Sequence, residues 1–239
     1  VFADGRVIPE AGYGLLAAGR QPVKVPIILG ANKHEVKLFF SFDRSFDWRS
    51  DLYQAAGKYG SMRWKAGAVD SLARALTAIP DHPPVYAYRF DWGSPDENGE
   101  SPLPRNWPLK LGAAHTFEIP FFLGTDSLNG PLYTWRLFTR ANRPGRKALS
   151  ETMMKYVSSF LRTGDPNAAG DGAGRPKWET WSNEEGGPKV ILFDVDGDEP
   201  DIEMRYVEDS LESIMELMVE ELDEPLLSET LEYLNERQE

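Results

Sequence analysis

Three short apolar runs stand out along the chain, and each predicts a β-strand. Val25–Gly30 is a β-branched run that ends at a glycine, and Pro84–Trp92 is an aromatic run set between prolines and a glycine. Val190–Phe193 is a third, shorter candidate. Such nearly continuous apolar runs are typical of strands buried on both faces, as in parallel sheets. We therefore expect a mostly parallel central sheet, with Ala31–Glu35 as the loop at the carboxyl end of the first strand.

Helical periodicity appears between and after these runs. Apolar residues recur at helical spacing in Val69–Ile79 until Pro80, and in Leu149–Leu161 until Gly164. Helices that alternate with strands in this way predict an α/β fold, with the sheet flanked by helices. The stretch from Gly93 to Pro108 has no periodicity and predicts a long connection.

A crowd of aromatic residues separates the first strand from the first of these helices. Two interpretations stay open for them: packing in a helical core, or an aromatic wall beside a substrate gorge. The residues are Phe39, Phe40, Phe42, Phe46, Trp48, Tyr53, Tyr59 and Trp64.

Composition narrows the class of protein. The 239 residues are 41% hydrophobic and 27% charged, the balance of a globular protein with one sizeable core or two small ones. The absence of cysteine excludes disulfides, thiolate chemistry and cysteine metal sites, and slightly favours a cytoplasmic location, as does the lack of a visible secretory leader. The longest apolar runs are too short to cross a bilayer. Because the chain begins at Val1, we expect a processed or truncated piece.

The net charge of −12 is concentrated at one end of the chain. Residues 207–239 hold 12 acidic side chains against Arg237 alone, which leaves 26 acidic and 25 basic residues before them. This distribution excludes the basic stripe of a nucleic-acid-binding protein. We therefore expect two parts: residues 1–206 form an α/β body, and residues 207–239 form an acidic tail.

The tail pattern predicts two short amphipathic helices with acidic outer faces. We expect them to dock on the body or on a second copy of the chain, which would make a homo-oligomer. Anionic lipid would repel them, so we expect no membrane binding. The predicted buried face of the first helix consists of Leu211, Ile214, Met215, Met218 and Leu222, and that of the second, after Pro225, consists of Leu226, Leu227, Leu231 and Leu234.

His115 and Glu35 are the candidate catalytic residues. His115 is one of only three histidines and lies in Trp107–Gly124, which the pattern predicts to be a loop, while Glu35 follows the first strand. A carboxylate bound to one imidazole nitrogen leaves the other free to take a proton from a serine. Taken singly, each also suits a structural role, as a loop histidine or a solvated carboxylate. Other carboxylates that compete for the acid role are Asp43, Asp47 and Asp91.

Metal chemistry has little support in the sequence. His34-Glu35 does not begin a zinc helix motif, because Leu38 stands where a second histidine is needed. Asp194–Asp201 reads as an acidic turn region but lacks the spacing of a calcium-binding EF-hand loop. We expect no metal and no cofactor.

Three segments resemble the type-B carboxylesterase and cholinesterase-like family of α/β-hydrolases. They are VPIILGANKHE (Val25–Glu35), AAHTFEIPF (Ala113–Phe121) and FLRTGDPN (Phe160–Asn167). The resemblance implies a Ser-His-Glu triad in the order nucleophile, acid, histidine, with Glu35 as the orienting carboxylate and His115 as the base. It also implies a small-molecule ester as substrate. Since the secreted cholinesterases of eukaryotes carry disulfides, the lack of cysteine favours a bacterial relative.

The chain departs from that family at three positions next to the pair. His34 stands where aspartate is usual, and Val36 and Thr116 stand where glycine is usual. These changes affect the local backbone and pocket width more than the identity of the pair. Glu118 matches the acidic residue after the family's histidine, and we expect it to bind nearby backbone rather than to act in catalysis.

The sequence contains no G-x-S-x-G elbow and no recognisable oxyanion loop. The resemblance therefore implies the C-terminal portion of an α/β-hydrolase fold, with the serine on an N-terminal half supplied by another polypeptide. One alternative is a catalytically silent cholinesterase-like adhesion or scaffold protein, but such a protein has no chemical need to keep both residues. Another is an unrelated α/β protein whose acidic helices bind a partner.

Overall fold

A four-stranded sheet carries the fold. It consists of β1 (Ile27–Asn32), β2 (Val85–Phe90), β3 (Val190–Asp196) and β4 (Glu199–Arg205), in that spatial order. The first three strands are parallel, and β4 returns antiparallel to β3. This computed structural model describes residues 5–6, 10, 14–20, 23–44, 46–128, 130–168 and 175–236. The prediction of a mostly parallel sheet in an α/β fold is confirmed.

The first strand differs from its prediction in place and in burial. β1 includes Ala31 and Asn32, which were predicted to be loop, because the ladder continues to the pair Asn32–Phe90. Within the described residues β1 pairs with β2 alone, so its outer edge is open. Its first four residues are therefore only half-buried, and the prediction of full burial on both faces is wrong for them.

The acidic region Asp194–Asp201 is a β-hairpin, in which the expected turn is limited to Gly197-Asp198 and the other residues belong to strands. Asp194 to Asp196 belong to β3, and the chain reverses at Gly197-Asp198 into β4. In β4 charged residues alternate with half-buried Ile202 and Met204, the two-residue period of a strand with one face in water. This strand was not predicted from the sequence, because its many charges suggested a turn.

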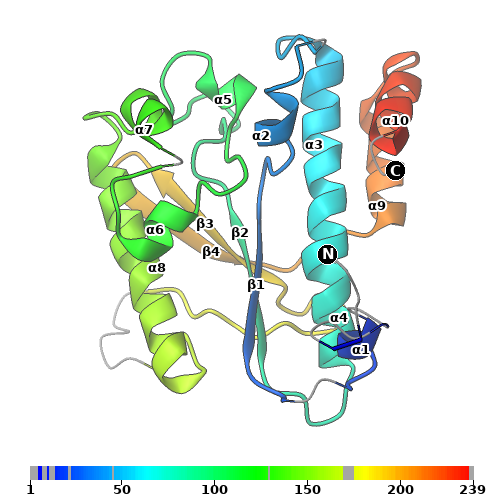
Figure 1. Cartoon of the computed structure of the whole chain (residues 1–239), viewed down its shortest axis with the longest axis vertical. Coiled ribbons are helices and arrows are strands. Elements are labelled where there is room, and N and C mark those ends of the chain that lie inside the picture. The colour runs from blue at the N-terminus through cyan, green and yellow to red at the C-terminus, as the bar shows by residue number, and fades with distance from the viewer. Residues whose placement is uncertain are drawn as a thin grey trace.

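Helices cover both faces of the sheet (Figure 1). On one face lie α3 (Asp51–Lys65), a π-helical turn (Ala66–Asp70) and α4 (Ser71–Thr77). On the other lie α6 (Ile119–Leu123) and α8 (Arg143–Thr163). Side chains alternate along β2 accordingly: Val85 and Ala87 pack with α4, while Tyr86 and Phe90 join the core beneath α6 and α8. The flanking helices are thus confirmed.

The long helix α8 ends where the sequence predicted, but one residue of its predicted buried face is exposed. Gly164 follows it in the left-handed conformation, with φ of 77°, and caps it. Leu161, predicted on the buried face, is 77% exposed, because the buried face runs through Leu149, Met153 and Tyr156. Four short helices complete the body: α1 (Gly14–Ala17), α2 (Lys37–Phe40), α5 (Trp107–Lys110) and α7 (Pro131–Leu137). In the described part of the chain, no helix has both the length and the apolarity to cross a membrane.

The acidic tail forms two helices, α9 (Leu211–Glu221) and α10 (Leu226–Glu236), which lie outside α3 in Figure 1. They pack on α3 through the buried side chains of Ile214, Met218 and Leu234. Leu211 and Met215, predicted on the buried face of α9, are 64% and 43% exposed instead. Residues 237–239 lie outside the described residues, and the division of the chain at residue 206 stays a prediction.

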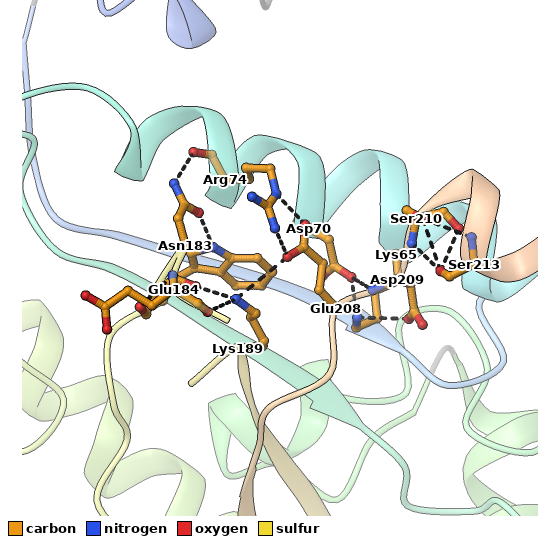
Figure 2. Close-up of polar contacts among 12 residues, drawn as sticks. Lys65, Asp70, Arg74, Asn183, Glu184, Lys189, Glu208, Asp209, Ser210 and Ser213 are labelled. Atoms are coloured by element: carbon orange, nitrogen blue, oxygen red, sulfur yellow. Dashed lines mark hydrogen bonds and ion pairs between the residues drawn. The ribbon is translucent and has the colours of Figure 1, made fainter. Parts of the chain in front are cut away.

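Ion pairs fasten the start of the tail to the body, as Figure 2 shows. Lys65 Nζ lies 2.5 Å from Asp70 Oδ2 and 2.9 Å from Asp209 Oδ2, and Asp209 N donates to the same Asp70 oxygen over 2.7 Å. Arg74 binds Glu208 through two nitrogens. Basic side chains of α3 and α4 thus neutralise the first acidic residues of the tail. The net charge of the chain did not indicate these pairs.

Candidate active site

Two loops meet at the carboxyl ends of β1 and β2. One follows β1 and carries Glu35; the other runs between α5 and α6 and carries His115. The backbone joins them directly, since His34 N donates to Ala113 O over 3.0 Å and His34 bridges to Ala114. The segment Trp107–Gly124, predicted to be a long loop, contains the two short helices α5 and α6 with a turn between them. Pro108 and Pro120 favour these helices, because each occupies the first turn of one of them.

The candidate pair is in contact. His115 Nδ1 lies 2.5 Å from Glu35 Oε2, and Glu35 Oε1 accepts a hydrogen bond of 2.7 Å from Asn32 N. Glu35 is 4% exposed, whereas the side chain of His115 is 35% exposed. No described residue binds His115 Nε2. The carboxylate is thus fixed in a buried position, and the outer nitrogen of the imidazole remains free for a proton.

Asn32 is a residue of this site that the sequence analysis missed. Its Nδ2 donates to Ala114 O over 2.7 Å and to Glu118 Oε2 over 2.5 Å, so it ties the end of β1 to both sides of His115. Burial raises the pKa of the Glu118 carboxyl, and the hydrogen bond from Asn32 opposes that shift. The carboxylate of Glu118 thus accepts from the Asn32 side chain and also from its own backbone N–H, so it binds nearby backbone as expected. The only signal in the sequence was an amide three residues before the candidate acid.

Two of the competing carboxylates, Asp91 and Asp47, have partners other than His115. Asp91 is held by Arg89, with two contacts of 2.8 Å, and Asp47 accepts from Arg49 N in a local turn. Over the described ranges no group of three or more His, Asp or Glu side chains is arranged to hold a metal ion.

The aromatic segment splits between the two interpretations left open for it. Tyr53 and Tyr59 are fully buried in the core between α3 and the tail helices. Phe39 and Trp64 instead lie beside His115, with ring centroids 5.3 and 5.6 Å from the imidazole, and are 45% and 39% exposed. Apolar surface therefore adjoins the imidazole.

The residues before His115 must be small. Gly112, Ala113 and Ala114 are buried, and Gly112 has φ of +55°, in the left-handed region. A Cβ built on Gly112 would lie 2.2 Å from His34 Nδ1. Thr116, where the family resemblance favours glycine, also has positive φ, of 72°, which is a costly conformation for a β-branched residue.

We expect Gly112→Ala to lower the free energy of unfolding by about 3 kcal/mol, because it adds left-handed strain of about 1–2 kcal/mol to a steric overlap with His34. Chemical denaturation measures this change. Gly67→Ala is the matched control, since a Cβ there meets nothing within 4 Å, and it should lose no stability. Equal stability of the two variants would show that the two loops do not meet as described.

Known carboxylesterases and cholinesterases are similar in sequence to parts of this chain. The sequence pattern of the carboxylesterase family matches residues 58–196. Acetylcholinesterase of Bungarus fasciatus is 37% identical over 101 residues, which is 41% of this chain and 13% of that protein. Carboxylesterase 5A of Canis lupus familiaris is 34% identical over 102 residues, 43% of this chain and 15% of that protein. The matched segments are thus a small part of these relatives.

A solved structure shows the same fold. The crystal structure of a carboxylesterase from Geobacillus stearothermophilus superposes with a TM-score of 0.52 at 23% identity. The superposition covers 84% of this chain and 41% of that one. The fold described above therefore corresponds to part of an α/β-hydrolase.

Proposed function

Because the chain belongs to the carboxylesterase family, we propose that it provides two of the three triad residues of a carboxylic-ester hydrolase. His115 is the general base and then the general acid, and Glu35 orients it. The nucleophilic serine lies on an N-terminal half of the same hydrolase. The observation that carries this proposal is the 2.5 Å contact between His115 Nδ1 and the buried carboxylate of Glu35.

The proposed chemistry uses the outer nitrogen of the imidazole. His115 Nε2 takes the proton of the serine hydroxyl as its oxygen attacks the ester carbonyl carbon, and Glu35 stabilises the imidazolium that forms. The imidazolium then gives this proton to the departing alkoxide, and an acyl-serine remains. In the second half of the reaction His115 takes a proton from a water molecule as the water oxygen attacks the acyl carbon. The bond from that carbon to the serine oxygen then breaks, the imidazolium returns the proton to the serine oxygen, and the carboxylic acid is released. These steps need no metal or cofactor.

Two features support a separate N-terminal half. The outer edge of β1 has no partner strand among the described residues, and Glu35 follows that strand directly. The superposed carboxylesterase has more than half of its length outside the matched region. A strand supplied beside β1 would place the residues that it carries next to the turn of Glu35.

A fluorophosphonate probe tests this proposal, because it labels an activated serine covalently. The 239-residue chain alone should not react and should not hydrolyse p-nitrophenyl esters. Combined with the N-terminal half, it should gain both activities, with the label on a serine of that half. A label on a serine of residues 1–239 would overturn the division of the triad, and a folded, assembled protein without turnover would favour a silent scaffold.

A further inference from the structure

A cavity lies beside the loop of Glu35, between the end of β1, the helix α3 and the tail. Its volume is about 440 Å³, which is within the range of small-molecule sites. His115 is not among its lining residues, whereas Asn32, Lys33 and His34 of the neighbouring turn are. Asp209 and Leu217 of the tail complete the wall. The docked tail therefore forms part of the wall of the cavity.

Positive charge dominates the lining of this cavity. Five basic side chains face one carboxylate, that of Asp209. Four of the five have acidic partners: Lys33 and Arg89 share Asp91, Lys65 binds Asp70 and Asp209, and Lys58 binds Glu221. The fifth is Lys37, which has no carboxylate partner among the described residues.

Lys37 is a buried cation held by neutral groups. It is 3% exposed, and its Nζ donates to Gln54 Oε1 over 2.8 Å and to Leu109 O over 3.2 Å. Burial, and then the charge of Lys33, lower its pKa to about 8. A buried ammonium without a counter-charge is costly, so an anion in the cavity would stabilise it.

His34 adds a neutral donor to the same wall. Its Nδ1 accepts from Ala113 N over 3.3 Å, and burial, followed by the charges of Lys37, Lys33 and Arg89, places its pKa well below the usual value. The ring is therefore neutral near pH 7, and its proton is on Nε2, which has no acceptor within the described part of the chain.

We propose that this cavity binds a small organic oxyanion, a carboxylate or a phosphate monoester, whose charged group pairs with Lys37. The apolar part of the ligand lies against Met62 of α3 and Leu217 of α9, which also line the cavity. The inference does not depend on the proposed esterase activity, since neither His115 nor an outside serine contributes to it.

Calorimetric titration of the purified protein, alone or joined to its N-terminal half, tests this site with inorganic phosphate, phenyl phosphate and benzoate. At least one organic anion should bind saturably and more tightly than inorganic phosphate, because only the organic ligands reach the apolar wall. Preference between phenyl phosphate and benzoate then identifies the charged group. Lys37→Met should weaken binding by about tenfold or more, the expected effect of one charge-assisted contact.

Lys155→Met is the matched control, since Lys155 is exposed on α8 and does not line the cavity, and it should leave affinity unchanged. Lys58→Met provides a second cavity variant that the fold tolerates, because the side chain of Lys58 is 44% exposed, and it should weaken binding several-fold. Absence of saturable binding by all three anions, or equal affinity of Lys37→Met, Lys58→Met and the control, would refute the proposal. Loss of esterase activity with binding intact would leave it standing.

Discussion

Replacing His115 with alanine should lower kcat of the assembled enzyme by about 10⁴-fold or more, the size of loss seen when a triad base is removed. No other described histidine contacts Glu35, so no second histidine is oriented by this carboxylate. Stopped assays with a p-nitrophenyl ester at saturating substrate measure the change.

His82→Ala is the matched control for this variant. His82 precedes β2 and so lies at the opposite end of the sheet from His115, where it contacts Pro83 O. It should keep nearly full kcat. If His115→Ala also kept most of its activity with an unchanged melting temperature, His115 would not be the base.

Replacing Glu35 with glutamine should lower kcat by about 10³-fold, somewhat less than loss of the histidine. Glutamine keeps the size of the side chain, and one oxygen could still accept the hydrogen bond from Asn32 N. However, its amide lacks the negative charge that stabilises the imidazolium. Measurement of kcat and KM separately should place the loss in kcat, because Glu35 is buried and does not reach substrate.

Glu118→Gln tests whether the effect belongs to Glu35 or to any carboxylate nearby. Glu118 accepts from Asn32 Nδ2, and the oxygen of a glutamine could do the same. We expect this variant to keep kcat within several-fold of the unmodified enzyme. Equal losses for Glu35→Gln and Glu118→Gln would mean that neither carboxylate has the specific orienting role.

The sequence predicted those elements whose burial follows a simple period. β1, β2 and α8 were visible in the sequence as apolar runs or apolar faces, because each contributes several apolar side chains to the core. β4 escaped notice because it buries only Ile202 and Met204 between charges. The face of α9 was misassigned because periodicity gives a set of neighbouring apolar positions, and only the partner helix determines which of them is covered.

The site was predictable only in part. Residue type and order suggested Glu35 and His115, and the family resemblance joined them. Asn32 could not be found in that way, because its role depends on the end of β1 meeting a loop that lies more than 80 positions later in the chain. The cavity around Lys37 was equally hidden, because its walls come from β1, α3 and the tail, which no local pattern connects.

The edge of β1 that no described strand covers has a consequence for how the proposed N-terminal half would be recognised. The strand, IILGAN, has neither a charged residue nor a proline, the two devices by which natural edge strands prevent unwanted pairing. The donors and acceptors along that edge belong to the main chain and are the same for every sequence, so they cannot distinguish a correct neighbour from a wrong one. Discrimination must come from the side chains on the two faces of the strand, and Ile28 and Leu29 are the ones placed to provide it.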